Sequence, residues 1–219
     1  RIPEKLSLAQ EPKYIANFAR EKECEVIVVD GYRFTFSYYK RLKDDIGTLV
    51  IIDDMADKKY ICDILLNQNI NASEGMYVGK TISDTVLLLG PTYALLRPKF
   101  RKYYHVQRNF SHVRNILITM GGGDPFNQTL KAMKALEMIK NDFSITVIIG
   151  PSNSNKESII EYSRVSQRKI EVFEDVDNIE ELMLEADIAI CAGGSTSWEI
   201  CCLGLPMVQI VVSDNQQMN

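Results

Sequence analysis

Short apolar runs, each followed by a segment with helical spacing, recur along the chain and constrain its fold more than any other feature. In CEVIVVDGY, residues 24–32, and in SITVIIG, residues 144–150, apolar side chains follow one another without alternation. Such strands are typical of a parallel sheet covered on both faces, because none of their positions faces water. The helical segments then serve as right-handed crossovers between strands. The pattern predicts an α/β fold built on doubly wound parallel sheets.

The pattern breaks between residues 91 and 113 and so divides the chain. This segment contains two prolines and many aromatic and basic side chains. A chain of 219 residues is long enough for two modest domains. We predict a Rossmann-like domain over residues 1–90, a crossover over 91–113 and a second Rossmann-like domain over 114–219. Because the chain begins RIPEKLSL, without Met, we expect that upstream sequence is missing and that the first domain is incomplete.

Composition and charge narrow the class of protein. Apolar residues make up 46% of the chain and charged residues 25%, as in ordinary globular proteins. The formal net charge of -4 gives no reason to expect a nucleic acid or an anionic membrane as partner. No uncharged apolar run of 18 residues is present, so we expect no membrane span. Five cysteines, an odd number without CxxC spacing, predict reduced thiols and a cytoplasmic protein.

The most informative stretch is CAGGSTSWEICCLGLP, residues 191–206, in which a strand leads through two glycines into a helix. Gly193 and Gly194 have no Cβ atom, so their backbone amides can approach a phosphate closely. The start of the helix adds unpaired N–H donors and the positive end of the helix dipole. Three hydroxyl side chains can donate further bonds: Ser195, Thr196 and Ser197. The stretch is neither a Walker loop nor a GxGxxG fingerprint.

Two interpretations of Glu199 are compatible with this stretch. Thr196 and Glu199 have the spacing of a capping box, which would explain both residues by helix formation alone. A carboxylate at the third helical position could also accept both hydroxyl groups of a ribose. The spacing alone leaves both interpretations open.

The residues after the other strands are further candidates, because ligands of open parallel sheets bind beyond the carboxyl ends of the strands. They are residues 30–32, 53–54 and 67–69 in the first half, and residues 121–124, 150–151 and 213–216 in the second. Asp124 followed by Pro125 also fits an ordinary helix start, with Asp124 as N-cap. Asp53 and Asp54 are adjacent on a strand and point to opposite faces, so we expect no metal there.

Several motifs together resemble one protein family: VVDGY, VIIDDMA, ILLNQN, LLLGPTYALLRPKF, ITMGGGDPFNQTLK, AGGSTSWEICCLGLP and SDNQ. It is the family of UDP-sugar hydrolases of pseudaminic acid biosynthesis, with the related spore coat polysaccharide biosynthesis protein G. These proteins are similar to the glycosyltransferase that adds N-acetylglucosamine to lipid-linked muramyl peptide, and share its two-domain GT-B arrangement. The resemblance implies release of UDP from UDP-2,4-diacetamido-2,4,6-trideoxy-β-L-altropyranose. Water would attack the anomeric carbon with inversion, without a metal or cofactor.

The resemblance also implies roles for individual residues. The diphosphate would lie on Gly193, Gly194, Ser195, Thr196 and Ser197, and the ribose on Glu199. Tyr32 would reach the sugar from the first domain and is a catalytic candidate together with Asn215. The remaining contacts to the sugar are expected from Asp30, Gly122, Gly123, Asp124, Asp214 and Gln216.

The chain departs from the family at both ends. The family opens with a glycine-rich loop of the GxGHxxR type, whose histidine is believed to be the general base, and this loop is absent here. The chain also stops at DNQQMN, before the expected final helices. We expect the intact protein to be an enzyme and this chain to bind nucleotide weakly at best. Two alternatives remain: a glycosyltransferase that uses a nucleotide sugar, and a non-catalytic protein that binds one.

Overall fold

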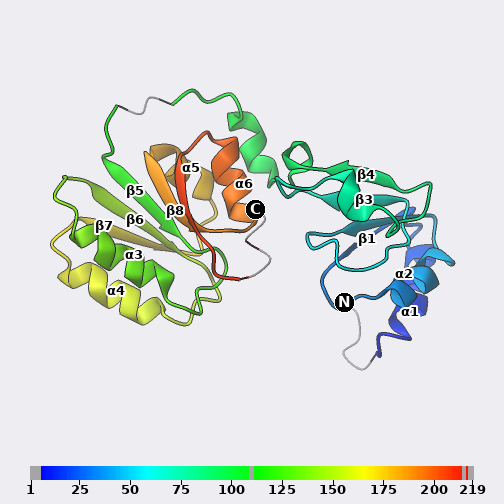
Figure 1. Ribbon diagram of the computed structural model, residues 1–219. Helices are drawn as coiled ribbons and strands as arrows, with labels where there is room; N and C mark the ends of the chain where they lie inside the picture. The colour runs from blue at the N-terminus through cyan, green and yellow to red at the C-terminus, as the bar shows by residue number, and fades with distance from the viewer. Residues whose placement is uncertain (1–5, 109–110, 214–215, 217–219) are drawn as a thin grey trace. The chain divides into compact units, whose positions relative to one another are not determined.

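The computed structural model describes residues 6–108, 111–213 and 216 (Figure 1). Backbone contacts divide the chain into two compact units, with the boundary between Ala94 and Leu95. Each unit contains one parallel sheet with helices between its strands. The expected α/β fold with two Rossmann-like sheets is therefore confirmed.

The first unit contains a four-stranded parallel sheet in which the strands lie in chain order. The strands are β1 (Val26–Asp30), β2 (Thr48–Ile52), β3 (Ile64–Asn67) and β4 (Val86–Leu89). Two α-helices pack against each other in this unit, α1 (Glu11–Glu21) and α2 (Phe36–Lys43). The sequence analysis did not anticipate α1, although Pro12 in its first turn is typical of a helix start. Short 3-10 helices follow β3 and β4 (Glu74–Tyr77 and Pro91–Tyr93).

The second unit contains a five-stranded parallel sheet with the order β7-β6-β5-β8-β9. The strands are β5 (Asn115–Thr119), β6 (Ser144–Ile149), β7 (Ile170–Glu174), β8 (Ile188–Ala192) and β9 (Met207–Ile210). Helices α3 (Gln128–Glu137) and α4 (Lys156–Val165) cover one face, and α5 (Ile179–Glu185) and α6 (Ser195–Cys202) cover the other (Figure 1). The run SITVIIG predicted β6 to within one residue.

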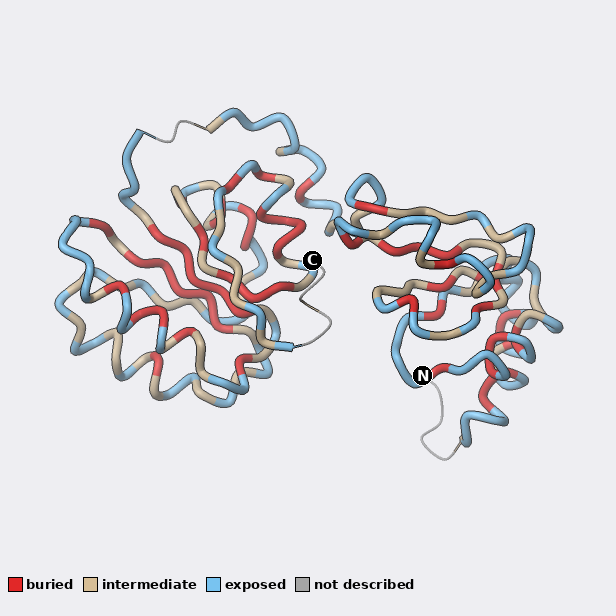
Figure 2. Tube along the Cα trace, viewed as in Figure 1, coloured by how far each residue is buried: buried red, intermediate tan, exposed pale blue. Residues whose placement is uncertain are grey.

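Burial explains why the central strands are apolar throughout. Residues 116–119 of β5 and 145–149 of β6 are buried on both faces (Figure 2). In α3, Met133 and Leu136 are one turn apart and both face the sheet. Full burial of such a side chain contributes about 1.5–3 kcal/mol. The edge strand β7 alternates between exposed and half-buried residues, because it has a neighbour on one side only.

The chain from Leu95 to Arg108 packs on the second unit instead of forming a solvated connection. It contains a 3-10 helix, Pro98–Tyr103, whose Phe100 is fully buried beside α5 and α6. The Arg108 guanidinium donates to the carbonyl oxygens of Met183 (2.8 Å), Ala186 (2.7 Å) and Leu203 (2.7 Å). Arg108 thereby closes the carboxyl end of α5 and joins it to the end of α6.

The order in which the chain adds strands to the second sheet reverses at β5. The chain leaves β5 for β6 and β7 on one side, then returns to the other side for β8 and β9. In doubly wound sheets the ligand lies beyond the carboxyl ends of the two strands at such a point. The fold therefore directs attention to the loops after β5 and β8.

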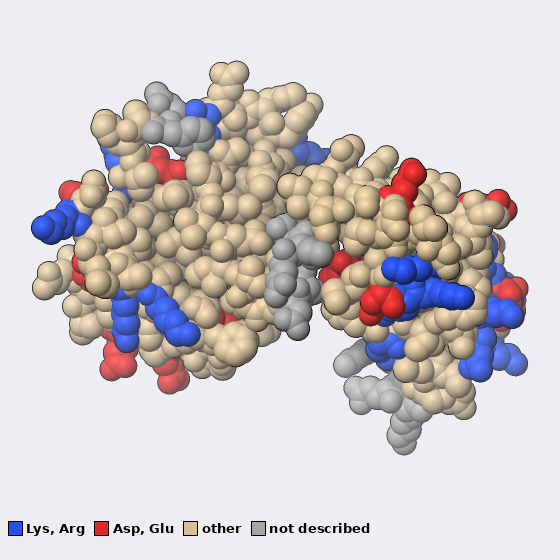
Figure 3. Space-filling model, viewed as in Figure 1, with Lys and Arg blue, Asp and Glu red and all other residues tan. Residues whose placement is uncertain are grey.

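The surface and helix lengths add two observations. On the face shown in Figure 3, charged side chains of the second unit lie mainly around its margin, with both signs interspersed. None of the helices in the described ranges is long and apolar enough to cross a membrane.

Candidate functional site

The loop after β8 ends in a helix start that leaves backbone donors open. Gly194 is the N-cap of α6 and has extended backbone angles (φ -169°, ψ -165°). The amide of Ser197 donates to the carbonyl oxygen of Gly194 at 3.0 Å. Among the described residues, the amides of Ser195 and Thr196 have no hydrogen-bond partner. Two N–H groups and the positive end of the helix dipole are therefore available to an anion.

The capping-box interpretation of Glu199 is wrong. The N-cap is Gly194 and not Thr196, and no side chain caps the helix. The Glu199 carboxylate is buried and receives a forked bond from Arg97: Nε lies 2.6 Å from Oε1 and Nη2 lies 2.7 Å from Oε2. Glu199 is thus free of any role at the start of its own helix.

The glycines of the two loops differ in the space around them. A Cβ atom added to Gly122 or Gly194 would meet no atom within 4 Å, so both positions open onto empty space. Gly121 has a φ of 74°, which few residues other than glycine adopt. A Cβ on Gly193, in contrast, would lie 2.6 Å from Nε2 of Gln209. Gly193 is therefore required for packing, whereas Gly122 and Gly194 leave room for a ligand.

A pocket of about 280 Å³ joins these loops at the carboxyl edge of the sheet. Its volume is near the lower end of the range for small-molecule sites, which is about 300–1,000 Å³. Strands β5 and β6, the start of α6 and the segment before Pro98 all contribute to its wall. The polar and glycine residues that line it include Arg97, Gly121, Gly122, Ser195, Thr196 and Glu199.

Asp124 is turned away from this pocket and toward helix α3. Its Oδ1 accepts the amide of Gln128 and its Oδ2 accepts the amide of Thr129, both at 2.8 Å. The helix begins at Gln128 with Asn127 as N-cap, so the expected start at Pro125 is wrong by three residues. Asp124 still satisfies the open amides of the first turn, from a position further upstream than a normal N-cap.

The segment after β9 is described only in part. Asp214 and Asn215, predicted as a sugar contact and as a catalytic residue, lie outside the described residues. Gln216 is described, and its Oε1 accepts the amide of Val212 at 3.0 Å. A Cβ on Gly193 would lie 3.0 Å from the Cβ of Gln216, so Gln216 lies directly beside the glycine loop.

The sequence profile of the glycosyltransferase family 28 C-terminal domain matches residues 115–219. The second unit carries a family 28 C-terminal domain. The loops after β5 and β8, and most of the pocket between them, lie within the matched residues. Within the pocket wall, only the segment around Arg97 precedes this domain.

Two curated relatives confirm the resemblance drawn from the motifs. The UDP-2,4-diacetamido-2,4,6-trideoxy-beta-L-altropyranose hydrolase of Campylobacter jejuni is 28% identical over 93% of this chain. The spore coat polysaccharide biosynthesis protein SpsG of Bacillus subtilis is 23% identical over 94% of this chain. The chain spans 72% of the hydrolase and 61% of SpsG. It spans only 41% of a third relative, the protein MJ1062 of Methanocaldococcus jannaschii, which is 28% identical.

Solved structures show the same fold. MurG of Acinetobacter baumannii aligns with 96% of this chain at a TM-score of 0.59 and 12% sequence identity, and the alignment covers 60% of MurG. The expected GT-B type of α/β fold is thus confirmed for this chain.

The predicted site residues of the first unit lie at the carboxyl ends of its strands. In the sequence they precede the family 28 C-terminal domain. Asp30 ends β1 and is exposed. Tyr32 is 62% exposed, and its hydroxyl donates to Oδ2 of Asp54 at 2.5 Å. Asp53 has different partners, the hydroxyls of Tyr60 at 2.7 Å and Tyr77 at 2.8 Å. The two adjacent carboxylates therefore have separate partners, although both lie beyond the end of β2 and not on the strand as expected.

Asp53 belongs to a buried polar network that the sequence analysis missed. Besides donating to Asp53, the Tyr77 hydroxyl accepts the side-chain amide of Asn67, which is fully buried, at 2.8 Å. The Asp53 carboxylate also accepts the amide of Ala56, at 2.8 Å. Burial, reinforced by the bond to Asp53, raises the pKa of Tyr60 well above its usual value. These groups fix the loop after β2, and no local pattern in the sequence links them.

Arg97 is a further residue whose role the sequence analysis missed. It occurs in the motif LLLGPTYALLRPKF, within the segment predicted as a crossover. Its partner Glu199 lies about a hundred positions further along the chain, so only the fold brings the two side chains together. Their pairing places Arg97 in the wall of the pocket at the carboxyl edge of the second sheet.

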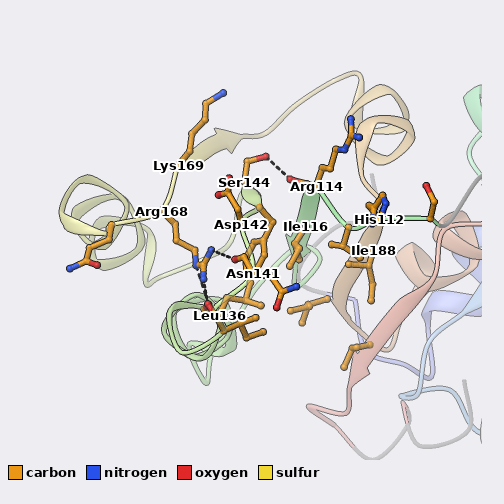
Figure 4. A pocket seen from close by; sticks show the side chains of 17 residues that line it. His112, Arg114, Ile116, Leu136, Asn141, Asp142, Ser144, Arg168, Lys169 and Ile188 are labelled. Carbon is orange, nitrogen blue, oxygen red and sulfur yellow. Dashed lines mark hydrogen bonds between the residues drawn. The ribbon is translucent and has the colours of Figure 1, made fainter.

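A larger hollow of about 1120 Å³ lies at the opposite, amino-terminal edge of the same sheet (Figure 4). Its floor is apolar, with Ile116, Ile188 and Val208. Arg168, its most prominent cation, donates to carbonyl oxygens at the end of α3, including that of Leu136 at 3.1 Å, and Lys169 points away from the floor. The bonds of Arg168 stabilise the end of α3. No glycine is among the residues that line the hollow. We therefore place the candidate site at the carboxyl edge.

Proposed function

We propose that this chain is part of a UDP-sugar hydrolase. The reaction releases UDP and a free 2,4-diacetamido-2,4,6-trideoxy sugar by inverting attack of water at the anomeric carbon. The observation that carries the proposal is the pair of open glycine loops beside the unpartnered amides at the start of α6. The relative from Campylobacter jejuni, whose name states such a hydrolase, supports the choice of substrate.

The diphosphate binds at the amino end of α6. The amides of Ser195 and Thr196 and their hydroxyls donate to its oxygens, and Gly194 leaves room for close approach. Each such charge-assisted bond contributes about 1.5–3 kcal/mol. Three or four of them are enough for a micromolar ligand, which requires about -8 kcal/mol. The negative charge that develops on the leaving UDP is then stabilised by donors that are already in place.

The ribose binds to Glu199 and the sugar binds beside the glycine loop. Gln216 is near Gly193 and can reach the sugar. Asp214 is proposed as a further sugar contact and Asn215 as a catalytic residue. We also propose a catalytic role for Tyr32, which belongs to the first unit and whose hydroxyl donates to Asp54. We omit Asp124 from the sugar contacts, because both of its oxygens accept backbone amides.

A glycosyltransferase is the second candidate, because the family 28 domain and the likeness to MurG fit transfer as well as hydrolysis. Both reactions leave UDP behind, so the nucleotide pocket cannot distinguish them. The difference lies in the acceptor, which is water in one case and a hydroxyl compound in the other.

The site is proposed to work in the cytoplasm, where nucleotide sugars are made. All five cysteines are free thiols, which fits a reducing compartment.

The test is product analysis with purified protein and UDP-2,4-diacetamido-2,4,6-trideoxy-β-L-altropyranose. We expect UDP and the free sugar to appear without any acceptor, with the opposite anomer formed first in the proton NMR spectrum. Turnover only after a hydroxyl acceptor is added would replace hydrolysis by transfer. Calorimetric binding of UDP without turnover under either condition would leave a non-catalytic binding protein.

A further inference from the structure

The forked pair between Arg97 and Glu199 has a geometry that bears on how the pocket selects its ligand. Glu199 is 5% exposed at its side chain, whereas the Arg97 side chain is 48% exposed. One carboxylate oxygen accepts from Nε and the other from Nη2, so both oxygens are held in one plane by one guanidinium. Arginine is suited to this role, because its donors form a rigid fork that matches a carboxylate.

The fork leaves part of the carboxylate unused. An ionised carboxylate has about four lone-pair sites, and the two bonds from Arg97 occupy one on each oxygen. One acceptor site per oxygen therefore remains, and Glu199 lines the pocket together with Ser195 and Thr196. The parallel bonds of the fork use the inner lone pair of each oxygen, so the two remaining sites point to opposite sides of the carboxylate and a single hydroxyl can donate to one of them.

Arg97 is itself held in place. Its guanidinium lies 5.4 Å from the ring centroid of Phe100, which is fully buried among α5 and α6. A second buried carboxylate, Glu180, also acts on this guanidinium, and the Oε2 atom of Glu180 has no partner among the described residues. The bond from Glu199 is the largest cause that raises the pKa of Arg97 above its usual value, and Glu180 adds to it. The ring of Phe100 and the fork to Glu199 thus hold the Arg97 guanidinium in place.

We propose that Arg97 is a positioning residue that presents the Glu199 carboxylate to the ribose 2′-hydroxyl of the nucleotide. This inference rests on the proposed UDP site and adds a cause of its selectivity for ribose. Without the fork the carboxylate would rotate about its own bond, and its free acceptor site would no longer be directed at that hydroxyl. Arg97 therefore affects the affinity for the ribose and does not affect the affinity for the diphosphate.

The test compares UDP with 2′-deoxy-UDP by calorimetry, in the wild-type chain and in three variants. Arg97→Lys keeps the charge and removes the fork, and Arg97→Gln removes both. Arg101→Gln is the matched control, since Arg101 lies in the 3-10 helix that directly follows Arg97 and is exposed. Inorganic pyrophosphate serves as a probe of the diphosphate part alone, and thermal unfolding checks that each variant folds.

We expect the wild-type chain to bind UDP about ten times more tightly than 2′-deoxy-UDP, as one lost hydrogen bond to a charged group predicts. In Arg97→Lys this ratio should fall to about two, while pyrophosphate binding stays within about twofold and Arg101→Gln behaves like wild type. An equal loss of UDP and 2′-deoxy-UDP in Arg97→Lys would mean that Arg97 only supports the pocket, and would overturn the inference. A wild-type chain that binds UDP without preferring ribose would also overturn it, leaving the proposed function standing. Failure of the wild-type chain to bind either nucleotide or pyrophosphate would instead overturn the proposed site itself.

Discussion

A Cβ atom on Gly150 would lie 2.1 Å from the carbonyl oxygen of Gly121, because the loops after β5 and β6 touch at this point. Gly194 has no such neighbour within 4 Å. We therefore expect Gly150→Ala to lower the free energy of unfolding by about 1–3 kcal/mol through overpacking. Gly194→Ala should lower it by less than about 1 kcal/mol, yet weaken UDP binding about tenfold because the methyl group enters the pocket.

Urea denaturation and calorimetry with UDP measure the two effects. Equal stability of the two variants would show that the loops can separate without cost. Unchanged UDP affinity in Gly194→Ala would exclude close approach of the diphosphate to that glycine.

Asp124 should contribute to stability through the first turn of α3. In Asp124→Ala the amides of Gln128 and Thr129 lose their acceptor, and Thr129 is 1% exposed. We expect a loss of about 0.5–2 kcal/mol, as for other carboxylates at helix starts. Asp142→Ala removes an exposed carboxylate from the same unit and is the control. If both variants unfold at the same urea concentration, the two hydrogen bonds make no net contribution to the free energy of unfolding.

The network around Asp53 predicts that removal of one oxygen atom, that of the Tyr77 hydroxyl, lowers the free energy of unfolding. Tyr77→Phe leaves the amide of the fully buried Asn67 without its acceptor and removes one donor from Asp53. An unpaired buried group costs about 1–3 kcal/mol. Tyr104→Phe, at a side chain that is 64% exposed, should change the free energy of unfolding by less than about 0.5 kcal/mol. A Tyr77→Phe variant as stable as the control would contradict the network.

The buried tyrosines should make the first unit sensitive to alkali. Burial raises the pKa of Tyr39 to about 12, with a further contribution from Asp53, while its value in the unfolded chain is about 10. The stability due to the neutral phenol is therefore complete below pH 10 and is lost as the pH rises toward 12. Between pH 9 and pH 11 we expect a loss on the order of 1 kcal/mol from this group.

Urea denaturation at both pH values measures this loss, and Tyr39→Phe isolates it. The phenylalanine variant should lose less stability over the interval than the wild-type chain. Identical losses would show that Tyr39 ionises in the folded state as easily as in the unfolded one.

The parallel strands were predictable because burial on both faces imposes an apolar run that needs no knowledge of neighbours. The pattern SITVIIG shows this, since it gave β6 with an error of one residue. The glycine loop at Gly194 was predictable for a similar reason, because its two features, missing Cβ atoms and a helix start, are local. The start of α3 was misplaced because Asp124 reaches its amides from upstream of Asn127, in a geometry that the usual N-cap spacing does not describe.

The remaining features depend on contacts between distant positions. Arg97 finds Glu199, and Asn67 finds Tyr77, only after the strands have paired. The spacing around Thr196 allowed a capping box with Glu199, but Arg97 gives that carboxylate two charge-assisted bonds instead of one backbone amide. Tertiary electrostatics therefore outweighed local helix capping at this position.

The place of β5 between β6 and β8 also bears on how the protein is made. On the ribosome, β5, β6 and β7 can pair while β8 is still inside the exit tunnel, and until then one side of β5 has open backbone groups. The proposed diphosphate site does not exist in such a nascent chain, because the start of α6 follows β8. Under the proposed function, a nucleotide can therefore protect only a polypeptide whose translation has passed α6, and cellular UDP cannot rescue chains that stall earlier.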